Sequence, residues 1–326
     1  MKTRIQYIDT LRFIAIISVI AIHSFGICSG EILNFETKSL NQAFHFAVPL
    51  FLMITGTLFL NKDINLKEFF KKRFVRILIP LMFFTAIVFI LFNRINVFSY
   101  YWYSWMILGV IFAIPIINKF IQHATDEEIT YYIVIFIIFS IIQQLCGIFK
   151  IRYALDISFF ITPVSYLILG YCLANVNIEK HQNKLLIVCI ALFIISTLIK
   201  IRTGSFRFTD EIYTYLDLSL LQIIQASSLF LFIRCLYQYK ISKGILENNV
   251  LKRFILSVSR SSYGMYLIQQ PLIFQVIYPY TKTLHLTGSQ SLALTISIII
   301  LVSLISWIAV LILSKIPILE KISGYH

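Results

Sequence analysis

The fold is decided by residues 8–28, which read IDTLRFIAIISVIAIHSFGIC. This stretch is long and apolar enough to cross a bilayer as a helix, yet it carries Arg12 and His23 eleven residues apart. Because each helical residue turns by about 100°, eleven residues return to nearly the same face about 16 Å further along. One stripe of a membrane helix therefore presents a cation near its entrance and an imidazole deep inside. Ionisable residues in a membrane span are candidate functional residues, and Asp9 is spaced to pair with Arg12 and offset part of its cost.

The composition fixes the class of protein. Hydrophobic residues make up 59% of the 326 residues and charged residues only 13%, and the mean hydropathy is +0.84. No water-soluble domain of this size needs so apolar a chain. We therefore predict an all-α fold, a polytopic membrane helical bundle that forms one transmembrane domain over residues 1–326. Apolar windows of about 20 residues predict roughly ten spans, near residues 8–28, 43–60, 74–93, 103–121, 129–148, 158–176, 184–201, 214–237, 261–281 and 292–314.

The placement of Lys and Arg orients these spans. With both termini in the cytoplasm, the cytoplasmic segments carry more than twice as many Lys and Arg residues as the opposite loops, in line with the positive-inside rule. We therefore expect a multi-pass protein of the inner cell membrane with a cytoplasmic N-terminus and C-terminus. The net charge of +13 is then a topology signal with affinity for anionic membrane lipid. No nucleic-acid partner is expected, because the sequence contains no soluble basic domain to bind one.

The five cysteines are scattered and lie in or near apolar spans. Their spacing matches neither a metal site nor a disulfide framework, so we expect no metal and interpret them as small packing residues. The sequence leaves the oligomeric state open.

A second cluster of cations lies where the chain re-enters the membrane, in KKRFVRILIP at residues 71–80. Arg73 and Arg76 are three residues apart, so they share a face at the cytoplasmic end of the third span. Such residues can simply anchor the topology by reaching for lipid phosphate. A fixed pair of arginines at a helix end, however, also suits bidentate capture of a phosphorylated ligand. The cluster therefore predicts a phosphorylated cytoplasmic ligand.

Together these residues carry a resemblance to a known family. The chain resembles the acyltransferase 3 family of integral membrane O-acyltransferases in four motifs that occur in the family's order. The motifs are Arg12 with His23 (Arg-x10-His), Val48 to Gly56 (ending in Thr-Gly), Arg73-x-x-Arg76, and Ser262-Tyr-Gly-Met-Tyr-Leu-Ile268. Gln269 is a departure, because we would expect a His at that position of the late segment.

The resemblance implies an activity and a set of partners. Members of this family move an acyl group, usually acetyl from acetyl-CoA on the cytoplasmic side, onto a hydroxyl of a surface glycan or lipid-linked sugar. It implies that His23 is the general base, with Arg12 and Asp9 also in the catalytic set. Arg73, Arg76 and Arg260 are then expected to hold the phosphates of CoA, together with Arg12. The sequence contains no serine nucleophile elbow, which favours direct transfer to the acceptor.

An alternative from a different class is a multi-pass transporter or flippase that exports a polysaccharide or lipid intermediate. In such a protein the intramembrane Arg12 and His23 would be coupling or substrate groups. The sequence shows no inverted repeat and no matched pair of interrupted spans, which favours the enzyme. Asp217, in the predicted eighth span, could neutralise Arg12 or orient His23.

Overall fold

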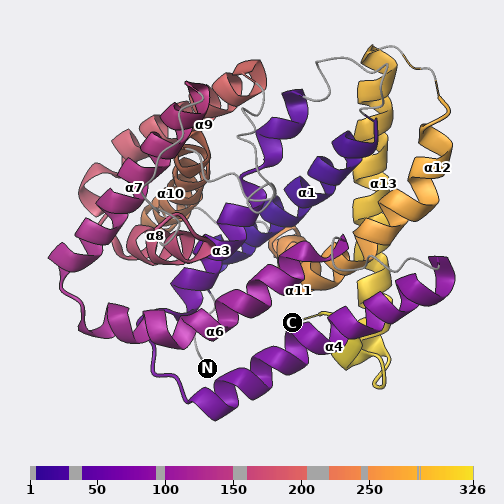
Figure 1. Ribbon diagram of the computed structural model, residues 1–326, viewed down its shortest axis with the longest axis horizontal. Helices are drawn as coiled ribbons and strands as arrows, with labels where there is room; N and C mark the ends of the chain where they lie inside the picture. The colour runs from indigo at the N-terminus through magenta and orange to yellow at the C-terminus, as the bar shows by residue number, and fades with distance from the viewer. Residues whose placement is uncertain are drawn as a thin grey trace. The chain divides into compact units, whose positions relative to one another are not determined.

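The computed structural model describes residues 5–28, 39–92, 100–149, 160–203, 220–243, 249–284, 286 and 288–325. Within these residues all regular elements are helices (Figure 1). The α-helices are α1 (Gln6–Cys28), α3 (Ala47–Phe59), α4 (Leu66–Phe92), α6 (Trp102–His123), α7 (Asp126–Ile148), α8 (Pro163–Asn175), α9 (Gln182–Thr203), α10 (Leu220–Ser242), α11 (Asn249–Pro271), α12 (Tyr278–Thr281) and α13 (Gly288–Lys315). The prediction of an all-α polytopic membrane fold is confirmed.

In the described residues, eight helical segments are long and apolar enough to cross a membrane, against the roughly ten spans predicted. Helix α8, inside the predicted span 158–176, has only 13 residues and a length of about 20 Å, too short for a core of about 30 Å. The predicted span 261–281 is divided among α11, a π-helix (Leu272–Ile277) and α12. This region is not among the eight segments, because α11 is long enough to cross a membrane but is much more polar than the other helices.

Local sequence signals set several helix ends. The side chain of Asn65 accepts a hydrogen bond from the amide of Glu68 and so caps the start of α4. Thr125 and Glu128 form a reciprocal capping box at the start of α7, where each side chain accepts a hydrogen bond from the other's backbone amide. These caps satisfy amides that have no partner within the helix itself.

The helices form two compact units, each assembled from three separate stretches of chain. Unit 1 comprises Met1–Ala15, Gln42–Lys62 and Ile116–Asn248, and unit 2 comprises Ile16–Asn41, Asp63–Pro115 and Asn249–His326. Helices α1 and α6 each contribute one part to each unit. The prediction of a single transmembrane domain is not tested by this division, because neither unit is a contiguous segment.

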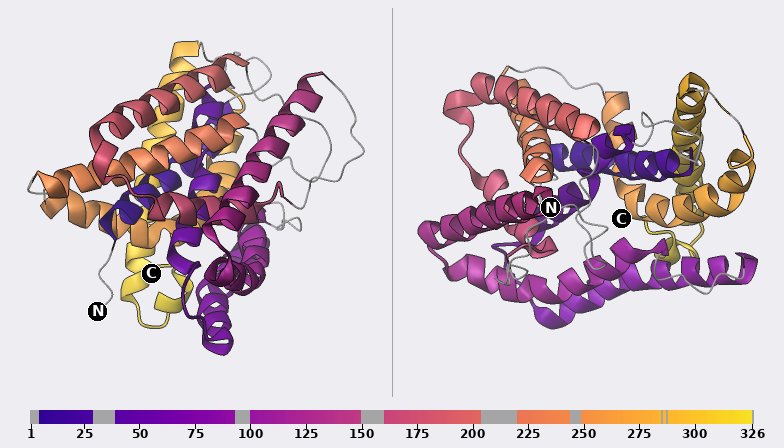
Figure 2. Two further views of the ribbon diagram at one scale, coloured as in Figure 1. Left: turned by 90° about the vertical axis from the view of Figure 1, so that its left-hand side faces the viewer. Right: turned by 45° about the horizontal axis from the view of Figure 1, so that its top comes forward.

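Unit 1 is held by close helix contacts and buried amides. A Cβ atom added to Gly56 on α3 would lie 1.9 Å from the carbonyl oxygen of Leu167 on α8, and one added to Gly170 would lie 2.2 Å from that of Met53. The Thr-Gly end of the second predicted span therefore serves close helix packing. Helices α9 and α10 run side by side (Figure 2). The amide of Gln225 on α10 donates to the hydroxyl of Thr197 on α9 at 2.8 Å.

Unit 2 is organised around α11, which packs against α13 and α4. The Tyr263 hydroxyl donates to the carbonyl oxygen of Ile77 on α4 at 2.9 Å. The C-terminal turn also lies against α11, since a Cβ atom on Gly264 would be 2.1 Å from the carbonyl oxygen of Ser323. Gly324 in this turn has a φ of +69°, a conformation that favours glycine. Unit 2 thus fixes the helix that carries the late motif of the sequence.

Candidate functional site

The predicted base, His23, lies in unit 2 on the second half of α1, against the C-terminal end of α11. Its Nδ1 is 3.0 Å from the side-chain oxygen of Gln269, and its Nε2 is 3.3 Å from the side-chain nitrogen of Gln270. Both glutamines are buried, whereas the imidazole is half-buried. Two neutral amides of α11 therefore hold the two ring nitrogens of a histidine on α1.

The local backbone of α11 explains how this contact arises. Pro271 ends α11 and has no N–H, so the carbonyl of Leu267 lacks its usual helical donor. The hydroxyl of Tyr101 supplies the missing hydrogen bond at 3.0 Å. Directly after Pro271 the chain continues as the π-helix Leu272–Ile277. Such π segments are often found at functional sites, and this one begins two residues after Gln270, the second of the two glutamines that hold His23.

The π-helix also supplies an aromatic wall beside His23. The ring of Phe274 packs edge-on against the imidazole, with 5.8 Å between ring centroids. The ring of Tyr100 packs on Phe274 at 6.1 Å, and the amide of Gln275 donates to the Tyr100 hydroxyl. The imidazole is therefore confined on one side by aromatic rings while its nitrogens are hydrogen-bonded.

The contact of Gln269 and Gln270 with His23 was not predicted from the sequence. The available signal was the pair of amides in the segment LIQQPLIF, residues 267–274, which is otherwise apolar. Gln269 stands where a His was expected, and it keeps a hydrogen-bonding group there. A polar pair next to a helix-ending proline, in a region predicted to cross the membrane, could have marked the site.

The predicted donor-binding arginines gather at the junction of α4 and α11 in unit 2. The hydrogen bond from Tyr263 to Ile77 is one residue after Arg76 on α4 and one turn after Arg260 on α11. Arg73 lies one turn earlier on α4, is half-buried, and has its guanidinium 5.9 Å from the ring of Phe69. Arg76 is exposed and Arg260 is half-buried. The three arginines therefore lie within about one helical turn of the contact between α4 and α11.

Arg12 and Asp9 lie on the first half of α1, in unit 1. Asp9 is buried and Arg12 is half-buried, and between them Thr10 shares a hydrogen bond of 2.6 Å with the Tyr237 hydroxyl. Arg12 and His23 belong to one continuous helix, as predicted. The pairing of Asp9 with Arg12 stays a prediction. Asp217 lies outside the described residues.

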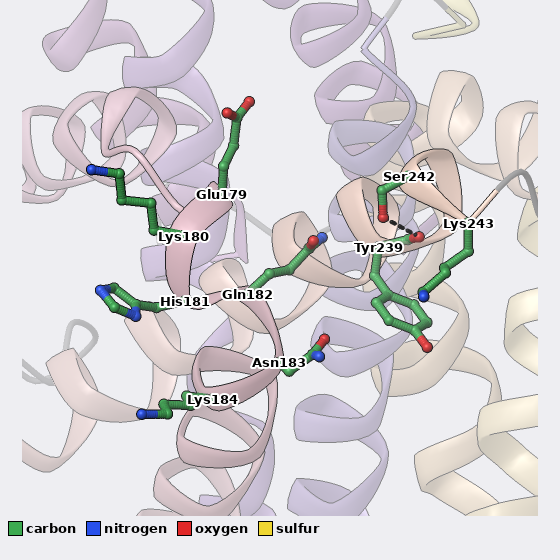
Figure 3. Close-up of a pocket in the computed structure, with 9 residues that line it drawn as sticks. All are labelled: Glu179, Lys180, His181, Gln182, Asn183, Lys184, Tyr239, Ser242 and Lys243. Atoms are coloured by element: carbon green, nitrogen blue, oxygen red, sulfur yellow. Dashed lines mark hydrogen bonds between the residues drawn. The ribbon is translucent and has the colours of Figure 1, made fainter.

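A cavity of about 360 Å³ in unit 1 was not predicted. It lies between the start of α9 and the end of α10, and its walls include Lys180, His181, Lys184 and Lys243. In Figure 3, Lys180, His181 and Lys184 point away from Lys243 and do not converge on a common point. These cations therefore do not form an anion site.

These features define a polytopic membrane protein in which two buried amides hold a histidine side chain. Arginines lie on the two helices next to the contact between α4 and α11. The chain belongs to the acyltransferase 3 family, since the acyltransferase domain of that family matches residues 5–312, nearly its whole length. No curated protein and no solved structure matches it. The protein is thus a membrane acyltransferase, which favours the enzyme over the transporter or flippase alternative.

Proposed function

We propose that this protein transfers an acetyl group from cytoplasmic acetyl-CoA to a hydroxyl of an extracytoplasmic glycan or lipid-linked sugar, in the inner cell membrane. The observation that carries the proposal is the geometry of His23, whose two ring nitrogens are each held by a buried amide. A neutral imidazole that is hydrogen-bonded at one nitrogen can use the other nitrogen as a base.

The reaction then proceeds by direct transfer. The acceptor hydroxyl gives its proton to Nε2 of His23 as its oxygen forms a bond to the thioester carbonyl carbon. The carbon–sulfur bond breaks, and the leaving thiolate of CoA takes the proton from the imidazolium. The products are an ester and free CoA, and His23 returns to its neutral form. No covalent enzyme intermediate is needed, in keeping with the lack of a serine nucleophile elbow in the sequence.

The donor is held by its phosphates. Arg73 and Arg76 on α4 and Arg260 on α11 lie near the contact between Tyr263 and Ile77, and a guanidinium group can bind a phosphate through two hydrogen bonds. We assign Arg12 to the path by which the donor reaches His23, because Arg12 lies three turns before His23 on the same helix. We assign Asp9 the role of balancing the positive charge of Arg12. The length of α1 between Arg12 and His23, about 16 Å, is comparable to that of an extended pantetheine arm.

Replacement of His23 by Ala tests the proposal. The variant should insert normally, because the change makes α1 more apolar, and acetyl transfer should be lost. The measurement is the alkali-labile acetate on surface polysaccharide from cells that carry the parent, the His23→Ala variant or no copy of the chain. His181→Ala is the matched control, since His181 is exposed in unit 1 and distant in sequence from every motif. Full acetylation by a normally expressed His23→Ala variant would refute the assignment of His23 as the general base.

A further inference from the structure

Gln269 and Gln270 hold His23, yet the proposed reaction gives neither a role. The side chain of Gln269 is fully buried, and its amide nitrogen points to the backbone carbonyl of Tyr266 at 3.4 Å. Its amide oxygen therefore faces Nδ1 of His23 at 3.0 Å. An amide oxygen can only accept a hydrogen bond, so Nδ1 must carry the proton.

Gln270 indicates the protonation state of the other ring nitrogen by the same reasoning. Its side-chain nitrogen faces Nε2 of His23 at 3.3 Å, and an amide nitrogen can only donate. Nε2 must therefore carry the lone pair. The two contacts agree on one tautomer, in which Nδ1 is protonated and Nε2 is free to act as a base.

We infer that Gln269 is a positioning residue that fixes the Nδ1–H tautomer of His23, and that Gln270 occupies the base until an acceptor hydroxyl replaces it. This inference rests on the proposed role of His23 as general base. Gln269 is well placed for such a task because it is itself fixed by the turn of α11 that precedes Pro271. Gln270, two residues before the π-helix, is the partner that must be displaced.

The tautomer decides whether the base can work. If Nε2 carried the proton, it would have no lone pair for the acceptor hydroxyl at that nitrogen. Gln269→Leu removes one of the two contacts that select Nδ1–H, so kcat should fall by about 10- to 100-fold, the range seen when the hydrogen-bond partner that orients a metal-binding histidine is lost. The KM for acetyl-CoA should stay unchanged, because the arginines of the donor site are intact. Gln269→Glu keeps an acceptor at the same place and should retain the tautomer.

The two glutamines should affect the pH profile in opposite directions. The Gln269 oxygen stabilises the N–H of the charged ring more than that of the neutral ring, so its loss should move the acid limb of kcat to lower pH. The Gln270 N–H stabilises the lone pair of the neutral ring only. Gln270→Leu should therefore move the acid limb to higher pH. If the glutamines only packed the helices together, the two variants would not shift the acid limb of kcat in opposite directions.

The experiment combines kinetics with a direct view of the tautomer. Parent, Gln269→Leu, Gln269→Glu and Gln270→Leu proteins are reconstituted in liposomes, and kcat is measured against pH with acetyl-CoA and isolated surface polysaccharide. Solid-state ¹⁵N NMR of histidine-labelled protein reports which nitrogen of His23 is protonated, with the signal assigned by its loss in His23→Ala. The matched control is Gln275→Leu, because Gln275 lies on the same π-helix but bonds Tyr100 instead of His23. This control should leave the tautomer of His23 unchanged.

The expected result is a protonated Nδ1 in the parent, in Gln269→Glu and in Gln275→Leu. In Gln269→Leu a measurable share of the rings should carry the proton on Nε2 instead, because only Gln270 then favours the Nδ1–H form. An unchanged tautomer in Gln269→Leu, or acid limbs that fail to move apart, would overturn the inference. The NMR signal needs no turnover, so it is read independently of activity. Retained activity in His23→Ala would instead refute the proposed function, whatever tautomer the spectra show.

Discussion

Gly264 offers a sharp test of how unit 2 is packed. Replacement by Ala would place a Cβ atom 2.1 Å from the carbonyl oxygen of Ser323 and 2.6 Å from Cγ2 of Val310. The Val310 side chain can turn away, but the oxygen belongs to the backbone of a fully buried turn residue. The turn would have to retreat by about 1.3 Å to reach a normal contact of 3.4 Å. Neighbouring Gly324 packs equally closely, since a Cβ position there is 2.7 Å from the Gly264 amide nitrogen, so a retreat would break this second contact as well.

Overpacking of this kind costs about 3 kcal/mol, at the upper end of the usual range, because backbone has to move. A loss of that size should lower the melting temperature by roughly 5–10 °C. The assay is thermal unfolding in detergent, followed by the fraction of protein that stays monodisperse on size exclusion. Gly109→Ala is the matched control, since a Cβ atom there meets nothing within 4 Å and Ala is the better helix former. Equal melting temperatures for Gly264→Ala, Gly109→Ala and the parent would refute the close packing of the C-terminal turn on α11.

Two further predictions concern the donor. Arg76→Lys should weaken CoA binding by about tenfold or more although it keeps the charge, because Lys lacks the planar guanidinium group that binds phosphate through two hydrogen bonds. The measurement is the affinity for CoA in detergent at two salt concentrations. Equal affinity of the variant and the parent would mean that Arg76 only anchors the topology. In sealed vesicles of known orientation, acetyl-CoA should support transfer only from the face that bears residues 62–76, and the glycan should be modified only on the opposite face. Full turnover with both substrates supplied on the donor face alone would contradict the proposal that acetyl-CoA reaches His23 from the cytoplasmic side while the acceptor binds on the opposite side.

Much of the fold follows from local sequence alone. Bilayer thickness demands long apolar helices, so hydropathy finds α1, α4 and α13 without knowledge of the rest of the chain. The same logic predicts one continuous span over residues 261–281, because hydropathy does not see that Pro271 and the following π-helix divide this region. Helix α8 is apolar but short, and a window of 20 residues cannot distinguish that from a complete crossing.

The site was only half predictable for a related reason. His23 was predicted as a functional residue because an imidazole deep in an apolar span costs free energy, and such residues usually have a functional role. Its partner Gln269 is 246 residues away in sequence, and no local pattern links the two. The motif Arg73-x-x-Arg76 was visible as a helix-face pair, whereas its meeting with Arg260 depends on how α4 and α11 pack. Pairings between distant segments are set by tertiary contacts, which one sequence does not display.

The neutral character of the partners of His23 has a physical consequence for a base inside a membrane. A carboxylate at position 269 would stabilise the imidazolium more strongly, but it would leave an unbalanced negative charge beside a neutral imidazole whenever the enzyme rests. In a span such a charge costs several kcal/mol, whereas an amide orients the ring at no such cost. In the proposed reaction the imidazolium would exist only while the thiolate of CoA is released nearby, so the two charges would appear and vanish together. Gln269 thus suits a direct transfer, in which no charged intermediate has to be stored in the bilayer.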